Sequence, residues 1–269
     1  MKKFISHLIK FYLLPIGVVI LFFRTPSSLF LNESKEIYDL VSKAISTDIK
    51  AKTILLGDSV CKQFYSETKN SDTYCLCENQ SYEVPGNYLL LKGQIANNPD
   101  LKKVVLLINP VTLTSSLNQK YTYNYFMKPF SPLLGHLELN DRSYLNTLYP
   151  KENILTYKFS NFKLPDSLTN QTDVGNLTIS KLNMKYIKKM DSLCNVNNVE
   201  FVFKSPPLPS NMKKDVERFD MNSKKSLSDY FSSIMYYDSI LSSDGIHHKD
   251  APTYIMKNKK SLDNLINKS

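Results

Sequence analysis

Short, continuously apolar runs alternate along this chain with longer segments in which apolar residues recur every three or four positions. The runs are typical of strands buried on both faces, and the longer pattern is typical of amphipathic helices. The predicted strands cover residues 52–56, 73–77, 103–108, 199–203 and 235–237. Because parallel strands need crossover connections, this alternation predicts an α/β fold with a mainly parallel sheet.

The predicted helices cover residues 31–49, 60–68, 88–96, 177–194, 223–233 and 252–266. Residues 111–176 differ, because they combine many aromatic residues and several prolines with little periodicity. We interpret this stretch as an insertion after the third predicted strand. The chain is then organised as one α/β domain over 51–269, preceded by a helical connector over 25–50.

The N-terminal residues have the layout of a membrane segment. Lys2 and Lys3 precede an apolar stretch over 11–23, and counting from Phe4, with the Lys10 stem lying along apolar surface, gives about 20 residues, enough to cross about 30 Å. No small-x-small cleavage site follows Arg24. We predict an uncleaved signal anchor over 1–24, with a cytoplasmic N-terminus and the domain periplasmic or extracellular. A cleaved signal peptide and a buried core helix are the alternatives.

Charge and cysteine content narrow the class of partner. The 269 residues contain 34 Lys plus Arg and 25 Asp plus Glu, a net charge of +9. The lysines are scattered without a dense basic block, so no nucleic-acid partner is predicted, whereas anionic lipid, an acidic glycan or simple solvation would suit them. The four cysteines, Cys61, Cys75, Cys77 and Cys194, leave one disulfide or buried free thiols open. No second Cys/His pair stands at ligand spacing, so no metal site is predicted.

Candidate chemistry follows the first strand and precedes the last helix. Gly57-Asp58-Ser59 comes directly after the first predicted strand, so Ser59 would project at the carboxyl end of the sheet, where sites form in such folds. Asp244 and His247 are three residues apart. A nucleophilic serine needs a base and the base needs an orienting carboxylate. Each motif alone has a simpler interpretation, as an ordinary turn or a solvated histidine pair.

Together, the Gly-Asp-Ser and Asp-x-x-His motifs resemble the SGNH (GDSL-type) hydrolase superfamily. The resemblance implies a flavodoxin-like three-layer α/β/α sandwich. It also implies that Ser59 is the nucleophile, His247 the base and Asp244 its partner, with His248 as a fallback base. The oxyanion donors it implies are Ser59, Gly86 and Asn109. The family's Gly-x-Asn-Asp block is replaced here by Asn-Pro-Val-Thr over 109–112.

This departure is typical of divergent, membrane-anchored members of bacterial envelopes, which work beside membrane-bound O-acyltransferases. The resemblance therefore implies a serine esterase or O-acyltransferase that needs no cofactor and acts on acyl, mainly acetyl, esters of envelope or exopolysaccharide glycans. The candidate substrate-binding residues are Asp58, Tyr123, Tyr125, Lys128 and Arg142. The aromatic residues among them could instead pack the insertion onto the core. A noncatalytic scaffold of the same fold and an unrelated anchored α/β protein remain the alternatives.

Overall fold

The structure is a computed structural model that describes residues 2–24, 34–66, 72–78, 83–118, 122–148, 178–222 and 227–267. Its centre is a four-stranded sheet in the order β2-β1-β3-β4, with every neighbouring pair parallel. The strands are β1 (Thr53–Gly57), β2 (Thr73–Cys77), β3 (Lys103–Leu107) and β4 (Glu200–Lys204). The predicted α/β fold with a parallel sheet is confirmed, and the order matches the first four strands of the flavodoxin-like order 2-1-3-4-5.

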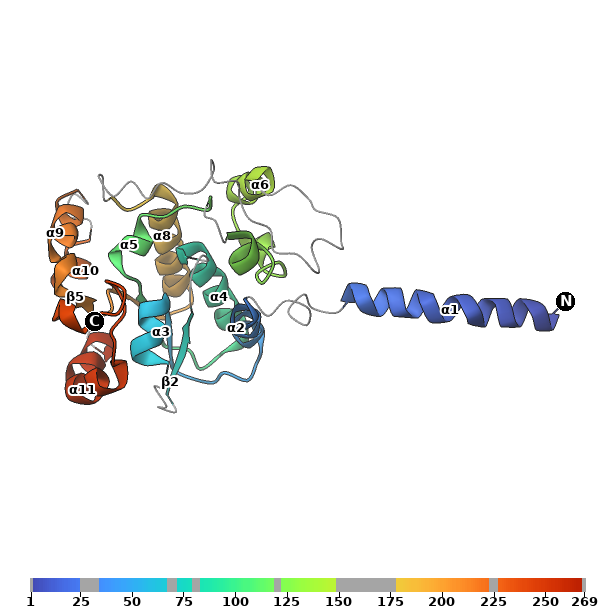
Figure 1. The fold of residues 1–269 in the computed structure, drawn as a ribbon, viewed down its shortest axis with the longest axis horizontal. Helices are drawn as coiled ribbons and strands as arrows, with labels where there is room; N and C mark the ends of the chain where they lie inside the picture. The colour runs from blue at the N-terminus through green and yellow to red at the C-terminus, as the bar shows by residue number, and fades with distance from the viewer. Residues whose placement is uncertain are drawn as a thin grey trace.

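Helices cover both faces of this sheet (Figure 1). One face carries α2 (Lys35–Ile45), α4 (Glu83–Asn97) and α8 (Lys181–Val196), and the other carries α3 (Ser59–Tyr65) and α11 (Ala251–Asn267). Side chains of a strand point alternately to the two sides. Accordingly, Ile54 and Leu56 of β1 belong to the core on the α4 side, whereas Leu55 belongs to the core on the α3 side.

Helix α2 lies within the stretch predicted to be a connector, and it packs against α4. Ile37, Leu40 and Val41 are buried in the same core as the helices of that face. Gln94 of α4 donates a hydrogen bond to the backbone carbonyl of Ala44 in α2, at 2.8 Å. The C-terminal half of the connector therefore contributes to the core of the α/β domain.

Two predictions near the C-terminal part of the sheet were inaccurate. The last predicted strand exists as β6 (Tyr236–Tyr237), but it pairs with β5 (Leu208–Pro209) in a separate two-stranded sheet. The helix predicted over 223–233 is the shorter α10 (Ser228–Ser232), and residues 223–226 lie outside the described residues. The sequence pattern also missed α9 (Lys213–Asn222), in which Val216 and Phe219 are buried.

The insertion contains four short helices in the part that the structure describes. It contains α5 (Pro110–Leu113), the π-helix η2 (Tyr123–Met127), the 3-10 helix η3 (Leu134–His136) and α6 (Leu139–Leu148). Residues 149–177 lie outside the described residues. Because π and 3-10 turns do not repeat at 3.6 residues, the amphipathic pattern was absent from the sequence. The aromatic residues Phe126 and Phe130 are fully buried in the core on the α4 side.

Residues Lys2–Arg24 form α1, which extends away from the domain (Figure 1). Of the helices in the described part of the chain, none combines the length and the apolar character needed to cross a membrane. The membrane anchor expected over 1–24 stays a prediction. That prediction depended on counting through Lys10, because only the 13 residues between Lys10 and Arg24 are continuously uncharged.

Candidate active site

Ser59 is placed by the sharp connection between β1 and α3. The Asp58 side chain caps α3, since its Oδ1 accepts hydrogen bonds from the backbone N–H groups of Val60, at 3.0 Å, and Cys61, at 3.2 Å. A Cβ atom on Gly57 would lie 2.1 Å from the carbonyl oxygen of Leu107 in β3. Only glycine allows the end of β1 to approach the β3 backbone this closely. The chain then turns directly into α3, whose first residue is Ser59.

Ser59, His247 and Asp244 form a connected chain of hydrogen bonds. His247 Nε2 lies 2.8 Å from Ser59 Oγ, and His247 Nδ1 lies 2.7 Å from Asp244 Oδ2. These distances fall within the range expected for a serine nucleophile, its base and an orienting carboxylate. The loop that carries the pair turns at Gly245, whose φ of 88° is a conformation that glycine adopts without strain.

Asp244 Oδ1 holds the backbone of the loop, and its hydrogen bonds help to keep the carboxylate charged. Asp244 Oδ1 accepts hydrogen bonds from the backbone N–H groups of Ile246, at 3.0 Å, and His247, at 2.8 Å. Partial burial raises the pKa of Asp244, but these hydrogen bonds and the bond from the His247 ring outweigh it and lower the pKa to about 2. The carboxylate is therefore ionised at neutral pH. It favours a proton on Nδ1, which leaves Nε2 of a neutral ring free to accept the proton of Ser59.

Asp58 does not face a substrate space. Its side chain is buried, and its Oδ2 accepts hydrogen bonds from the backbone N–H of Asn109 at 2.8 Å, the Asn109 amide at 2.7 Å and the Thr112 hydroxyl at 3.2 Å. Burial raises the pKa of Asp58, while the hydrogen bonds from Asn109, Cys61, Thr112 and Val60 oppose that rise. The geometry gives Asp58 a structural role, joining the ends of β1 and β3, rather than the substrate-binding role expected from the sequence.

The expected oxyanion donors are only partly in place. Asn109 Nδ2 donates to Asp58 and, at 3.1 Å, to Thr112 Oγ1, so both of its amide hydrogens are used inside the protein. Gly86 is buried in the first turn of α4. Helix geometry leaves the Ser59 N–H without an intrahelical acceptor, while Asp58 occupies the next two N–H groups of α3. Among the described residues at the N-terminus of α3, the backbone N–H of Ser59 is thus the donor that can reach an oxyanion.

The residues expected to line a substrate groove do not gather around the triad. Tyr123 and Lys128 are buried, with the Lys128 ammonium 5.0 Å from the centre of the Tyr123 ring. Tyr125 is half-buried against the core on the α4 side, and Arg142 is exposed on α6. Helices α6 and α11 lie on opposite sides of the domain in Figure 1. The geometry therefore favours packing of the insertion as the role of these aromatic residues.

His248 is not placed to act as the fallback base. It is buried, and its Nδ1 accepts a hydrogen bond of 2.9 Å from the backbone N–H of Asp250, directly before α11. Its ring packs against Phe64, Tyr237 and Tyr254, with centroid distances of 6.5, 4.8 and 5.0 Å. Burial in this aromatic cluster lowers the pKa of His248. The structure thus gives His248 a packing role.

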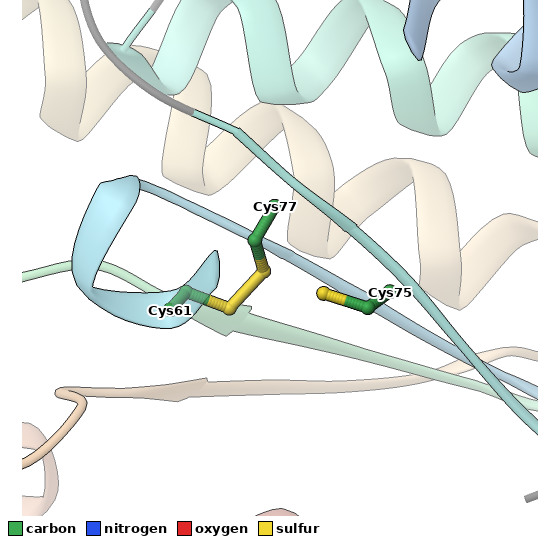
Figure 2. A group of neighbouring side chains, drawn as sticks. All are labelled: Cys61, Cys75 and Cys77. Carbon is green, nitrogen blue, oxygen red and sulfur yellow. A yellow bond between two sulfur atoms is a disulfide. The ribbon is translucent and has the colours of Figure 1, made fainter. Parts of the chain in front are cut away.

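Three of the four cysteines meet where α3 lies against β2 (Figure 2). Cys61 of α3 and Cys77 of β2 form a disulfide, and the Cys75 sulfur lies beside it, with all three sulfurs within 4.8 Å of one another. Three sulfurs at this spacing could hold a metal ion, but two of them are covalently joined here. Burial raises the pKa of Cys75 to about 11. The disulfide ties α3, two residues after Ser59, to the edge strand of the sheet.

Sequence reasoning missed two residues of the site. Thr112 hydrogen-bonds to Asp58, and the Gln63 side chain contacts the backbone of His248. The signal for Gln63 was its position four residues after Ser59, which places both on one face of a helix. No comparable signal marked Thr112, because its contact depends on how β1 and β3 are aligned.

Comparison with known proteins adds little to this geometry. No protein family and no curated protein matches the chain. A solved structure described as "a putative platelet activating factor from Streptococcus pneumonia" is similar over 92% of this chain and 99% of its own, with 15% sequence identity and a TM-score of 0.30. At this TM-score the similarity does not establish a shared fold, so the candidate site is defined by the chain's own residues.

Proposed function

We propose that this protein is a serine-dependent ester hydrolase or O-acyltransferase of the SGNH type. The observation that carries the proposal is the continuous Ser59–His247–Asp244 arrangement, with 2.8 and 2.7 Å between the bonded atoms. His247 Nε2 takes the proton of Ser59 as Oγ attacks an ester carbonyl carbon. The alcohol then leaves with that proton, and the acyl group remains on Ser59. Water or a sugar hydroxyl, deprotonated by His247, then attacks the acyl carbon. The bond from that carbon to Ser59 Oγ breaks, His247 returns the proton to Oγ, and the carboxylic acid or the new ester leaves.

The position of the site in the sheet supports this proposal. Ser59 follows β1, and Asp58 at the end of β1 is hydrogen-bonded to Asn109, which follows β3. In the flavodoxin-like order, the crevice between β1 and β3 is where the connections switch sides and where ligands bind. The carboxyl ends of β1 and β3 and the N-terminus of α3 therefore converge on the triad, as a flavodoxin-like sandwich would require.

The proposed location is outside the cytoplasm, with α1 as the attachment to a membrane. The Cys61–Cys77 disulfide supports an oxidising compartment. Exposed apolar side chains along α1, among them Phe11, Leu13, Leu14 and Leu21, support contact with lipid. The proposed substrates are acetyl esters of envelope or exopolysaccharide glycans, handled beside a membrane-bound O-acyltransferase. That choice rests on the family resemblance of the two motifs.

A noncatalytic scaffold in an envelope polysaccharide system is the second candidate function. One observation favours it: the amide of Asn109, an expected oxyanion donor, is committed to Asp58 and Thr112. Loss of an oxyanion donor costs about 10²–10³ in rate. A protein with only the Ser59 N–H at this position would be a weak enzyme or a binding protein built on the same fold.

A fluorophosphonate probe distinguishes the two functions, because it reacts covalently with an activated serine. We expect labelling of the wild-type protein at Ser59, seen by peptide mass spectrometry, and none in Ser59→Ala or His247→Ala. Ser66→Ala is the matched control, since Ser66 is an exposed serine at the opposite end of α3. Labelling should be followed by turnover of p-nitrophenyl acetate, with and without an added glycan acceptor. An unlabelled, folded wild-type protein would overturn the catalytic proposal and favour the scaffold.

A further inference from the structure

The Gln63 side chain joins the helix that carries Ser59 to the loop that carries His247. Its Nε2 donates a hydrogen bond of 2.7 Å to the carbonyl oxygen of His248, and its Oε1 accepts one of 2.9 Å from the N–H of the same residue. A single primary amide thus satisfies both backbone groups of one residue. Both hydrogen bonds have good lengths for neutral N–H···O pairs, and the side chain is half-buried.

Gln63 lies one helical turn after Ser59, so the two side chains point to the same side of α3. Their partners, His247 and His248, are consecutive in the loop. The Ser59–His247 bond and the Gln63–His248 pair are therefore two neighbouring connections between the same two segments. Any movement of the loop along α3 that lengthened one connection would strain the other.

Other hydrogen bonds of the loop hold its own shape or fasten it to different elements. Ser243 N–H donates to the carbonyl of His247 at 2.8 Å, and Ser242 forms a bridge with His248. The Tyr237 hydroxyl donates to the carbonyl of Ile246 at 2.9 Å, which ties the loop to β6. Within the described residues, Gln63 is the side chain of α3, apart from Ser59 itself, that hydrogen-bonds to this loop.

We propose that Gln63 is a positioning residue for the triad, holding His247 Nε2 within reach of Ser59 Oγ. This inference rests on the proposed function, since it concerns the same site. Asp244 orients the His247 ring within the loop, whereas Gln63 sets where the loop sits on α3. A base displaced by about 1 Å can cost about 100-fold in rate. Gln63 touches neither substrate nor the reacting atoms and acts through the backbone next to His247.

The test replaces Gln63 by Met, which keeps the length of the side chain and removes both hydrogen bonds. Gln94→Met is the matched control, because the amide of Gln94 also joins two elements, α4 and α2, through one bond of 2.8 Å to a backbone carbonyl. We expect Gln63→Met to lower kcat for p-nitrophenyl acetate by about 10- to 100-fold with KM within about twofold. Gln94→Met should leave kcat within about twofold while lowering the melting temperature to a similar degree.

A second variant and a spectroscopic readout keep the proposal testable if Gln63→Met folds poorly. Gln63→Glu keeps the acceptor for the His248 N–H but sets a carboxylate oxygen against the His248 carbonyl, so we expect a loss of kcat at pH 7.5 in this variant too. The proton on His247 Nδ1, assigned with His247→Gln, should give a downfield NMR signal. That signal should broaden or shift in both Gln63 variants and stay unchanged in Gln94→Met.

The outcomes separate this inference from the proposed function. If the wild type is active and the Gln63 variants keep both the full kcat and the wild-type signal of His247, Gln63 is only a stabilising contact and the inference is overturned. If the wild type neither turns over esters nor reacts with the fluorophosphonate probe, the proposed function fails. In that case the His247 signal still decides, in the same variants, whether Gln63 positions the loop.

Discussion

Replacing Asp58 with Asn tests whether one buried carboxylate joins β1, β3 and α3. The two side chains have the same shape, so packing is preserved, while the hydrogen-bonding pattern and the charge of the group change. The carboxylate accepts five hydrogen bonds, two from the backbone of α3 and three from Asn109 and Thr112. An amide has one oxygen, so it can serve only one of these two groups and must point its NH2 at donors of the other.

The cheaper orientation keeps the cap of α3 and turns the NH2 toward Asn109. The backbone N–H of Asn109 is then buried without an acceptor, which costs about 1–3 kcal/mol. The Asn109 amide could flip to accept from the new NH2, but Thr112 N–H would lose its 3.1 Å bond to Asn109 Oδ1, which costs about another 1 kcal/mol. The opposite orientation loses the helix cap, which is worth about 0.5–2 kcal/mol, and places the NH2 against the backbone N–H donors at the start of α3. The expected destabilisation is therefore about 2–4 kcal/mol.

Urea denaturation followed by circular dichroism measures this change, with the disulfide intact in both proteins. Asp100→Asn is the control, because Asp100 is exposed and surface changes of this kind stay within about 0.5 kcal/mol. A loss of less than about 1 kcal/mol for Asp58→Asn, with an unchanged denaturant slope, would refute the view that the Asp58 carboxylate organises the site.

Three further predictions concern the same region. Gly57→Ala should lower the free energy of unfolding by about 3 kcal/mol or more, because the new Cβ would lie 2.1 Å from a backbone carbonyl oxygen of β3. Gly135→Ala is the control, since nothing lies within 4 Å of its Cβ, and it should melt like the wild type. Equal melting temperatures for the two variants would contradict the clash. Reduction of the Cys61–Cys77 disulfide, which spans 16 residues, should lower the free energy of unfolding by about 3 kcal/mol, and Cys61→Ser should not respond to the same reductant. The pKa of Asp244 is lowered to about 2 in the folded protein, against about 3.9 in the unfolded chain. The ionised carboxylate therefore stabilises the folded protein at pH values above about 4, and this contribution is lost as the pH falls from about 4 to about 2. The difference in melting temperature between wild type and Asp244→Asn should therefore shrink over that interval, and a constant difference would contradict it.

Much of the sheet could be predicted because its strands are short apolar runs flanked by polar residues. The run over 73–77 is β2 as the structure has it, and β1 and β3 differ from their predictions by one residue at one or both ends. Helix α9 could not be predicted in this way, since charged residues dominate it and its burial depends on packing against other elements, such as Phe219 against Phe231 of α10. The separate pairing of β6 with β5 likewise depends on tertiary contacts, because a two-residue strand carries no preference for one sheet over another.

The positions of a serine, a histidine and a carboxylate of suitable chemistry relative to predicted strands and helices could be read from the amino-acid sequence. That much is local, because capping residues, a glycine before a helix and a three-residue Asp–His spacing depend on neighbouring positions. Which side chains hydrogen-bond to one another depends instead on how distant segments pack together. Asp58 and Asn109 are 51 residues apart and Gln63 and His248 are 185 apart. Contacts over such separations follow from the register of the sheet and the docking of a loop. They explain why Asn109 hydrogen-bonds to Asp58, why His248 lies among aromatic rings and why Gln63 hydrogen-bonds to the backbone beside His247.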